Sequence, residues 1–158
     1  MNVTIKPYQP EDKEAFYRLN EEWISAHFQM EAPDHEVLGN PEQYILDRGG
    51  FILVATLEDQ VVGVCALLKR EEIDGYELAK MAVAPAAQGK SIGYLLGKAA
   101  IEKARSMQAR RLFLDSNTRL HAAIKLYEKL GFKKAVGPPS PYARVDIQME
   151  LDLTALPQ

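Results

Sequence analysis

The chain has 158 residues, of which 47% are hydrophobic, and this suits a single domain with a buried core over residues 1–158. The formal net charge is only −3, so neither a nucleic acid nor an anionic membrane surface is expected as the main partner. The one cysteine, Cys65, excludes a disulfide within the chain and favours a reducing, cytoplasmic location. Since Cys65 lies in an apolar run, we expect a buried thiol.

The first third of the chain predicts a strand, a helix and an irregular segment. Residues 3–8 have strand character and are closed by prolines. Residues 11–28 predict an amphipathic helix, because apolar side chains recur three and four residues apart. Prolines and glycines interrupt residues 29–50, where only a short helix over 42–47 is expected.

Three strands are predicted in the middle of the chain. Residues 51–56 and 60–68 favour an antiparallel hairpin, and a polar turn over 71–75 precedes a strand over 76–83. Strict alternation in this last strand would give two faces. One face would carry Glu77, Ala79, Met81 and Val83, and the other Leu78, Lys80 and Ala82.

The remaining elements complete an α/β pattern. Helices are predicted over 92–107 and 119–130, with a strand over 112–116 between them. Two strands, 132–136 and 144–151, flank a proline-rich loop, and we expect the final strand at an edge of the sheet. This order predicts a mixed central sheet of about six to seven strands flanked by helices.

The turn after the strand 76–83 has the features of an anion site. Gln88-Gly89-Lys90-Ser91-Ile92-Gly93 connects this strand to the N-terminus of the next helix. Backbone N–H groups of such a loop and of the first helical turn converge on one point, and the helix dipole favours negative charge there. A pyrophosphate would fit this point.

Two kinds of phosphate loop occur in this context. Gly89-Lys90-Ser91 matches the end of the P-loop pattern G-x-x-x-x-G-K-[ST], although Ala84 stands at its first glycine. Asp115, at the end of a strand, resembles the aspartate that holds Mg²⁺ in such enzymes. The same loop also resembles the Q/R-x-x-G-x-G/A loop of the GNAT acetyltransferase superfamily, with Ser91 at the usual central glycine. The loop alone does not decide between them.

A second motif favours the GNAT superfamily. The segment Ala123-Ile124-Lys125-Leu126-Tyr127-Glu128-Lys129-Leu130-Gly131-Phe132 resembles the A-I-x-L-Y-x-K-L-G-F helix end of GNAT enzymes. It predicts a short amphipathic helix that ends in a glycine C-cap. A P-loop protein has no need for this element, so a P-loop nucleotide enzyme is the remote alternative.

The resemblance implies a GNAT fold, acetyl-CoA as co-substrate, and direct transfer of the acetyl group to an amine of a small molecule, amino acid or peptide. In this fold two strands splay apart, and the pantetheine arm of the coenzyme lies between them. The resemblance assigns coenzyme binding to Met81, Ala82, Val83, Gln88, Gly89, Lys90, Ser91, Ile92, Gly93, Tyr94 and Asn117. It also makes a homodimer an expected assembly, with the final strand as a pairing edge.

For three of these residues the sequence allows two alternative roles or conformations. Lys90 either reaches a phosphate oxygen or is solvated. Ser91 either keeps a negative φ or reshapes the loop, and its hydroxyl is itself a group that can bond a phosphate. Asn117 lies ten residues before Tyr127, farther than is usual in the family, so it either contacts the pantetheine or forms a strand-end turn.

Acetyl transfer to an amine needs a base for the ammonium and a proton donor for the leaving thiolate. By resemblance Glu77 is the general base, although a surface glutamate at a strand start is an equal alternative. Tyr127 is the expected donor to the thiolate sulfur, against a role in packing only. Other candidate bases are Glu21, Glu22 and His27. The histidines have no ligand spacing with one another or with Cys65, so no metal site is expected.

The acceptor amine is not identified by the sequence. The resemblance places its site in residues 23–50 and 137–144, where Arg48 and Arg144 are candidates for binding an acceptor carboxylate. Trp23, Phe28 and Tyr142 are candidates for an apolar wall. The alternative to an enzyme is a GNAT-fold protein that binds acyl-CoA without catalysis, as a sensor or partner module.

Overall fold

The computed structural model describes residues 2–154, which form one seven-stranded mixed sheet in the order β1-β2-β3-β4-β5-β7-β6. Only β4 and β5 are parallel neighbours; every other pair in this sheet is antiparallel. The strands are β1 (Val3–Pro7), β2 (Phe51–Leu57), β3 (Gln60–Arg70), β4 (Gly75–Val83), β5 (Arg111–Ser116), β6 (Lys133–Ala135) and β7 (Ile147–Asp152). The predicted mixed sheet flanked by helices is confirmed.

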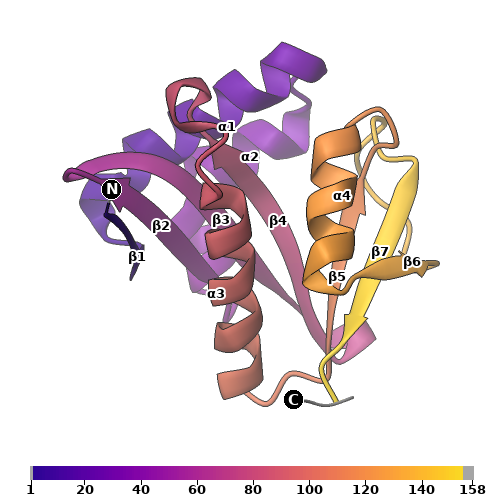
Figure 1. Ribbon diagram of the computed structural model, residues 1–158. Coiled ribbons are helices and arrows are strands. Elements are labelled where there is room, and N and C mark those ends of the chain that lie inside the picture. The colour runs from indigo at the N-terminus through magenta and orange to yellow at the C-terminus, as the bar shows by residue number, and fades with distance from the viewer. Residues whose placement is uncertain (1, 155–158) are drawn as a thin grey trace.

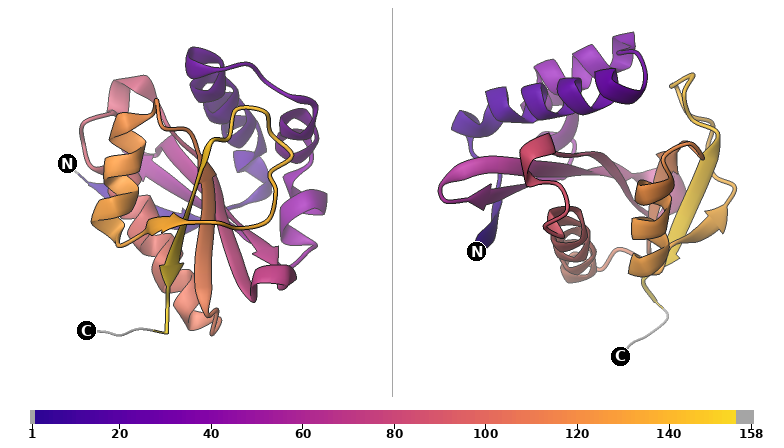
Figure 2. Two further views of the ribbon diagram at one scale, coloured as in Figure 1. Left: turned by 90° about the vertical axis from the view of Figure 1, so that its right-hand side faces the viewer. Right: turned by 45° about the horizontal axis from the view of Figure 1, so that its top comes forward.

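Two pairs of helices cover the two faces of the sheet (Figure 2, right). Helices α1 (Lys13–His27) and α2 (Ala32–Gly39) lie on one face, and α3 (Ile92–Ser106) and α4 (His121–Leu130) on the other. Each face has a separate apolar core, because successive strand residues point to opposite sides. No helix in residues 2–154 is long and apolar enough to cross a membrane.

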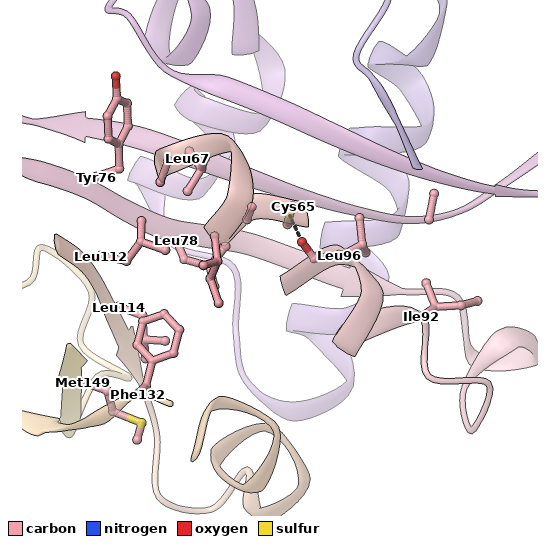
Figure 3. Packing of buried hydrophobic residues seen from close by; sticks show 14 of the residues in the cluster. Cys65, Leu67, Tyr76, Leu78, Ile92, Leu96, Leu112, Leu114, Phe132 and Met149 are labelled. Atoms are coloured by element: carbon pink, nitrogen blue, oxygen red, sulfur yellow. Dashed lines mark hydrogen bonds between the residues drawn. The ribbon is translucent and has the colours of Figure 1, made fainter. Parts of the chain in front are cut away.

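The core under α3 combines buried side chains from strands and helices, and Cys65 lies beside Leu96 of α3 (Figure 3). Leu96 and Ala100 of α3 and Leu67 of β3 are buried members of this core. The Cys65 thiol is itself fully buried, 4.0 Å from the carbonyl oxygen of Leu96, and burial raises its pKa to about 12. The expected buried thiol is therefore confirmed, and it is not a reactive one.

Helix α4 packs beside α3 because one residue of α3 has no side chain. A Cβ added at Gly97 would lie 2.5 Å from Cδ1 of Leu130, so any larger residue would require either this leucine or the helices to shift. Gly131 then ends α4 with a φ of 105°, which is the glycine C-cap that the sequence predicts.

Strands β4 and β5 pair over three residues and then separate, so that the sheet opens into a V (Figure 1). Their register runs from Gly75 opposite Arg111 to Glu77 opposite Phe113. Beyond Glu77, the edge of β4 that faces β5 therefore has no strand partner. β4 also carries a bulge near Lys80, whose φ is +54°, and the register with β3 shifts at this point.

This bulge makes the expected strict alternation along β4 wrong. Leu78 packs in the core under α3, and Met81 and Val83 pack against the same core. Ala82 lies in the core on the α1 side. A bulge inserts one residue into one strand of a pair, so the two-residue period changes phase when it crosses Lys80.

Two further expectations need correction. Residues 29–50 contain a second helix, α2, which begins with a capping box between Glu31 and Asp34 and has Pro33 in its first turn. The final strand, β7, is internal, since β5 and β6 lie on its two sides. The edges of the described sheet are β1 and β6, because the chain reverses after β6 and inserts β7 next to β5.

Candidate active site

The opening between β4 and β5 leads to two hollows that meet. One is a groove of about 640 Å³ between α3 and α4, called here the α3–α4 groove. The other is a cavity of about 100 Å³ beneath α1 and the loop before β7, called here the α1 cavity. Trp23, Met81, Leu120 and Tyr127 line both, so the junction of the two hollows lies at these side chains.

Most of the residues expected to bind a coenzyme line the α3–α4 groove. These are Met81, Ala82, Val83, Gln88, Gly89, Ser91, Ile92, Gly93 and Tyr94. Lys90 is not among the lining residues, and Asn117 lines the α1 cavity instead.

The loop before α3 has two residues in the left-handed region. Gly89 has a φ of +83°, and Ser91, the residue before α3, has a φ of +62°. The negative φ considered for Ser91 is thus not adopted, and the serine takes the conformation that a glycine would take at lower cost. Its side chain makes no capping hydrogen bond. The N–H groups of the first turn of α3 are consequently left for another acceptor.

The charge of the α3–α4 groove is positive. Arg119 and Lys129 line it, and no aspartate or glutamate of residues 2–154 does. The Lys129 ammonium lies 4.5 Å from the ring centroid of Tyr94 and forms no ion pair with any described carboxylate. Together with the N-terminus of α3, these cations make the groove suitable for an extended anion.

Tyr127 comes from the middle of α4 and reaches the junction of the two hollows. Its ring packs edge-on against Phe132, with 6.1 Å between the centroids. Burial, helped by the Cys65 thiol, raises its pKa to about 12, so the phenol is protonated at neutral pH. Its hydroxyl has no hydrogen-bond partner within the described chain. It is therefore a proton donor available to a ligand at the junction.

Glu77 lies in the α1 cavity at the last paired position of β4. It is 7% exposed and forms an ion pair with Arg70 of β3. Its pKa is raised by burial and by the negative charge of Asp115, although Arg70 and Lys80 oppose the shift. Glu21 and Glu22 are exposed and line neither hollow, whereas the third alternative base, His27, lines the groove.

Asn117 connects the end of β5 to the loop before β7. Its Nδ2 donates to the carbonyl oxygen of Arg144 at 2.7 Å, and its Oδ1 accepts from the backbone of Arg119 at 2.8 Å. This geometry is that of a strand-end turn. Asp115 lines the α1 cavity and not the groove that holds the glycine loop, so no Mg²⁺-holding carboxylate of the P-loop kind stands beside that loop.

Two lining residues of the α1 cavity, Lys80 and Arg144, belong to a buried ion-pair network around Asp34. Both terminal nitrogens of Arg144 donate to Asp34 at 2.7 Å, and the ammonium of Lys80 donates to the same carboxylate at 2.7 Å. Burial alone would raise the pKa of Asp34, but the bonds from Arg144 and the charge of Lys80 outweigh it and lower the pKa to about 2. Lys80 also donates to the hydroxyl of Tyr142 at 2.9 Å.

The sequence did not identify this network. Arg144 was expected to be a candidate for an acceptor carboxylate, yet it binds Asp34 and Glu31, and Arg48 lies over the ring of Tyr44 instead. The available signal was Lys80, a charged residue in the middle of the mainly apolar strand β4. Trp23, Phe28 and Tyr142, the candidates for an apolar wall, all line the α1 cavity.

Comparison with known proteins gives a family match and structural neighbours. The model of the Acetyltransferase (GNAT) family matches residues 11–132. N-acetylaspartate synthetase of Danio rerio is 37% identical over 99 residues, which are 63% of this chain and 35% of that protein. This chain thus spans about a third of the length of that curated relative.

Two solved structures have the same fold. A GNAT-family acetyltransferase from Staphylococcus aureus Mu50 superposes with a TM-score of 0.87 at 19% identity, covering 96% of this chain and 99% of that one. The structure of yncA, a proposed acetyltransferase from Salmonella typhimurium, contains its cofactor acetyl-CoA. It superposes with a TM-score of 0.76 at 21% identity, covering 97% of this chain and 95% of that one.

Proposed function

Because the chain belongs to the acetyltransferase (GNAT) family, we propose that residues 1–158 act as one domain that transfers the acetyl group of acetyl-CoA to a primary amine. The observation that supports this most is the meeting of two hollows of different character at Tyr127. A long cationic groove suits the coenzyme, and a small cavity containing a buried carboxylate suits the amine.

The coenzyme is placed by the unpaired part of β4 and by the loop before α3. The pantetheine arm lies in the V, where its amides bond the free edge of β4 near Met81 and Val83. The pyrophosphate lies over Gln88–Gly93, at the positive end of α3. Lys129 and Tyr94, at the same end of the groove, lie within reach of the nucleotide part. The Salmonella neighbour has acetyl-CoA as its cofactor, which supports acetyl-CoA as the coenzyme.

The proposed reaction uses two polar groups, Glu77 in the α1 cavity and Tyr127 at the junction. Glu77, directly or through a water, removes a proton from the ammonium, and the free amine nitrogen attacks the thioester carbonyl carbon. The nitrogen of the resulting tetrahedral intermediate gives its second proton to water, the carbon–sulfur bond breaks, and the electron pair goes to sulfur. The Tyr127 hydroxyl donates to this thiolate. Water then returns a proton to Tyr127 after its donation. The products are an N-acetylated amine and free coenzyme A.

The acceptor, the assembly and the location are open to direct tests. Aspartate is one acceptor to test, because the zebrafish relative is an N-acetylaspartate synthetase. A homodimer stays a prediction, and its pairing edge would be β1 or β6, since β7 is internal. A cytoplasmic location, and partners that exclude nucleic acids and membranes, likewise stay predictions.

A thiol-release assay with acetyl-CoA and a panel of amines, amino acids and peptides tests the proposed function. We expect coenzyme release that depends on the amine. If acetyl-CoA protects the protein against heat and no amine accelerates release, the protein is a non-catalytic acyl-CoA-binding module. Protection by Mg-ATP in place of acetyl-CoA would instead favour a nucleotide enzyme.

A further inference from the structure

The α1 cavity has two cations in its lining, Lys80 and Arg144, and protein carboxylates occupy both. Arg144 binds Asp34 through two nitrogens and Glu31 through one, at 3.1 Å for the latter. Lys80 donates to Oδ1 of Asp34, which also accepts from Nη2 of Arg144, and to the Tyr142 hydroxyl. Two cations and two carboxylates make this assembly neutral as a unit.

Neither cation can bind a ligand without giving up its ion pair with Asp34. The Asp34 side chain is 0% exposed, so either cation that left it would remove a partner from a fully buried charge. Removing one partner of a buried ion pair is strongly unfavourable. The carboxylate of an amino acid would therefore meet no free cation among the described residues that line the α1 cavity. It would meet the carboxylates of Glu77 and Asp115, which also line the cavity.

The volume of the α1 cavity also restricts the size of the acceptor that it can hold. Its volume is about 100 Å³, and its walls include the aromatic rings of Trp23, Phe28 and Tyr142. An apolar cavity of about 150 Å³ is the size that holds a benzene ring. The space beside Tyr127 thus suits a short aliphatic chain that ends in an amino group.

We propose that the acceptor is a primary alkylamine with no carboxylate on the carbon that bears the amino group, and not an amino acid. This rests on the proposed acetyl transfer and narrows its acceptor. The Asp34–Lys80–Arg144 network provides the selection, because it withholds both cations from the ligand. Aspartate is accordingly a poor acceptor, even though a relative is named for its acetylated form.

Four acceptors test the proposal on the wild-type protein. 3-Methylbutylamine, L-leucinamide and L-leucine share one side chain, and L-aspartate is the fourth. Leucinamide has the bulk of leucine without its negative charge, so it separates charge from size. We expect kcat/KM, corrected for the deprotonated fraction of each amine, to be at least about 100-fold higher for the first two. Equal or better use of leucine or aspartate overturns the proposal, as does binding of acetyl-CoA with no transfer to any of the four. Failure to bind acetyl-CoA would overturn the proposed function itself.

A variant tests the origin of the selection. Asp34→Asn removes the charge that holds Lys80 and Arg144, and we expect the preference for leucinamide over leucine to fall at least about tenfold. Glu36→Gln, an exposed position on the same helix, is the matched control and should retain the preference. An Asp34→Asn protein that folds and discriminates as wild type does would contradict the assigned role of the network. If the variant does not fold, the wild-type acceptor panel decides alone.

Discussion

The Tyr127 ring packs against Phe132, the residue lines both hollows, and its hydroxyl has no hydrogen-bond partner among the described residues. Burial keeps the phenol protonated, with a pKa of about 12. A phenol of such low acidity stabilises a thiolate mainly as a hydrogen-bond donor, and it does not need to lose its proton completely before the sulfur leaves.

The first prediction is that Tyr127→Phe lowers kcat by about 10²–10⁴ and leaves KM for acetyl-CoA nearly unchanged, the usual range for a lost acid or base. Stability should change little, because the hydroxyl has no partner to leave unsatisfied. Steady-state kinetics and thermal unfolding check both parts. Tyr76→Phe is the control, since its hydroxyl contacts Met107 away from both hollows. A fully active Tyr127→Phe enzyme would leave this residue with a packing role.

The second prediction concerns Glu77, whose pKa is raised above the ordinary glutamate value by burial and by Asp115. A base works only when it is ionised, so kcat/KM for the amine should rise as the pH increases through this raised pKa. Glu77→Gln should lower kcat/KM and lose this rise. Much of the activity should return near pH 10, where an alkylamine deprotonates by itself, with a pKa of about 10.

The control for Glu77 is Glu72→Gln. Glu72 also binds Arg70, at 2.9 Å, but it lines neither hollow. This variant therefore disturbs Arg70 and leaves the proposed base in place. If Glu77→Gln and Glu72→Gln have the same pH profile as wild type, Glu77 is not the base. His27, which lines the groove, would then be the next residue to test.

At the scale of elements, the strand–loop–helix unit from β4 to α3 was the most predictable part of the molecule. Its apolar strand, glycine loop and amphipathic helix follow one another within about 30 residues, and local pattern is enough to identify such a unit. The same holds for α4, whose glycine cap and apolar stripe are contained in ten residues. Nine of the eleven residues that the family resemblance assigned to the coenzyme line one groove, and all nine belong to the unit from β4 to α3.

The parts that sequence did not predict depend on distant contacts. Arg144 and Asp34 are 110 positions apart, and nothing local to either residue indicates the other. The bulge at Lys80 breaks a regular alternation that its neighbours support, because tertiary packing overrides local preference. The internal position of β7 depends on how residues 136–146 reverse the chain. The pattern of apolar residues within β7 does not indicate which strands lie beside it.

The third prediction follows from the left-handed Ser91. Such a conformation costs an L-residue roughly 1–2 kcal/mol, and glycine adopts it freely. Ser91→Gly should thus raise the free energy of unfolding by about 1 kcal/mol, since no capping hydrogen bond is lost. Urea unfolding measures the change. Ser91→Ala keeps the unfavourable φ and should give no gain, so a stabilised Ser91→Ala would contradict this origin of the effect.

The fourth prediction concerns the network that joins α2 to β4 and to the loop before β7. The pKa of Asp34 is lowered from 3.8 to about 2 in the folded protein. A lowered carboxyl pKa contributes stability that is present above the unfolded value and is lost as the pH falls through the folded value. The contribution is roughly 2 kcal/mol, and it should disappear between about pH 4 and pH 2.

Urea unfolding of the wild type and of Asp34→Asn over this pH range checks the fourth prediction. Asp34→Asn should be less stable at pH 7, by about 3–5 kcal/mol if it behaves like other broken buried pairs. Its stability should also fall less steeply between pH 4 and pH 2. Glu36→Gln, exposed on the same helix, should keep the wild-type slope. If the free energy of unfolding falls equally steeply with pH in wild type and Asp34→Asn, other carboxylates cause the acid sensitivity.

At the scale of the whole molecule, one opening of the sheet determines the site. The V begins where β4 and β5 stop pairing after Glu77 and Phe113. Helices α3 and α4 bound the groove on one face of the sheet, and α1 with the loop before β7 bounds the α1 cavity on the other. The coenzyme and the amine would thus approach from opposite faces. Their reacting groups would meet at Tyr127 without any domain movement.

The last prediction uses the stability of the whole molecule to test coenzyme binding. Acetyl-CoA at a hundred times its Kd should add about 2.7 kcal/mol to the free energy of unfolding, because it binds only the folded state. For a protein of this size this raises the Tm by roughly 5–11 °C. Gly93→Asp should abolish most of the shift, since it places an anion at the start of α3, where the pyrophosphate would lie.

Each variant is compared with its own ligand-free Tm, because a side chain at position 93 crowds the neighbouring helix. A Cβ there would lie 3.2 Å from Cδ2 of Leu126. Gly39→Asp is the matched control: a Cβ at Gly39 meets nothing within 4 Å, and the residue lies outside the groove. It should retain the full shift with acetyl-CoA. Equal protection of wild type and Gly93→Asp would place the pyrophosphate elsewhere, and the left-handed loop before α3 would then be a turn without a ligand.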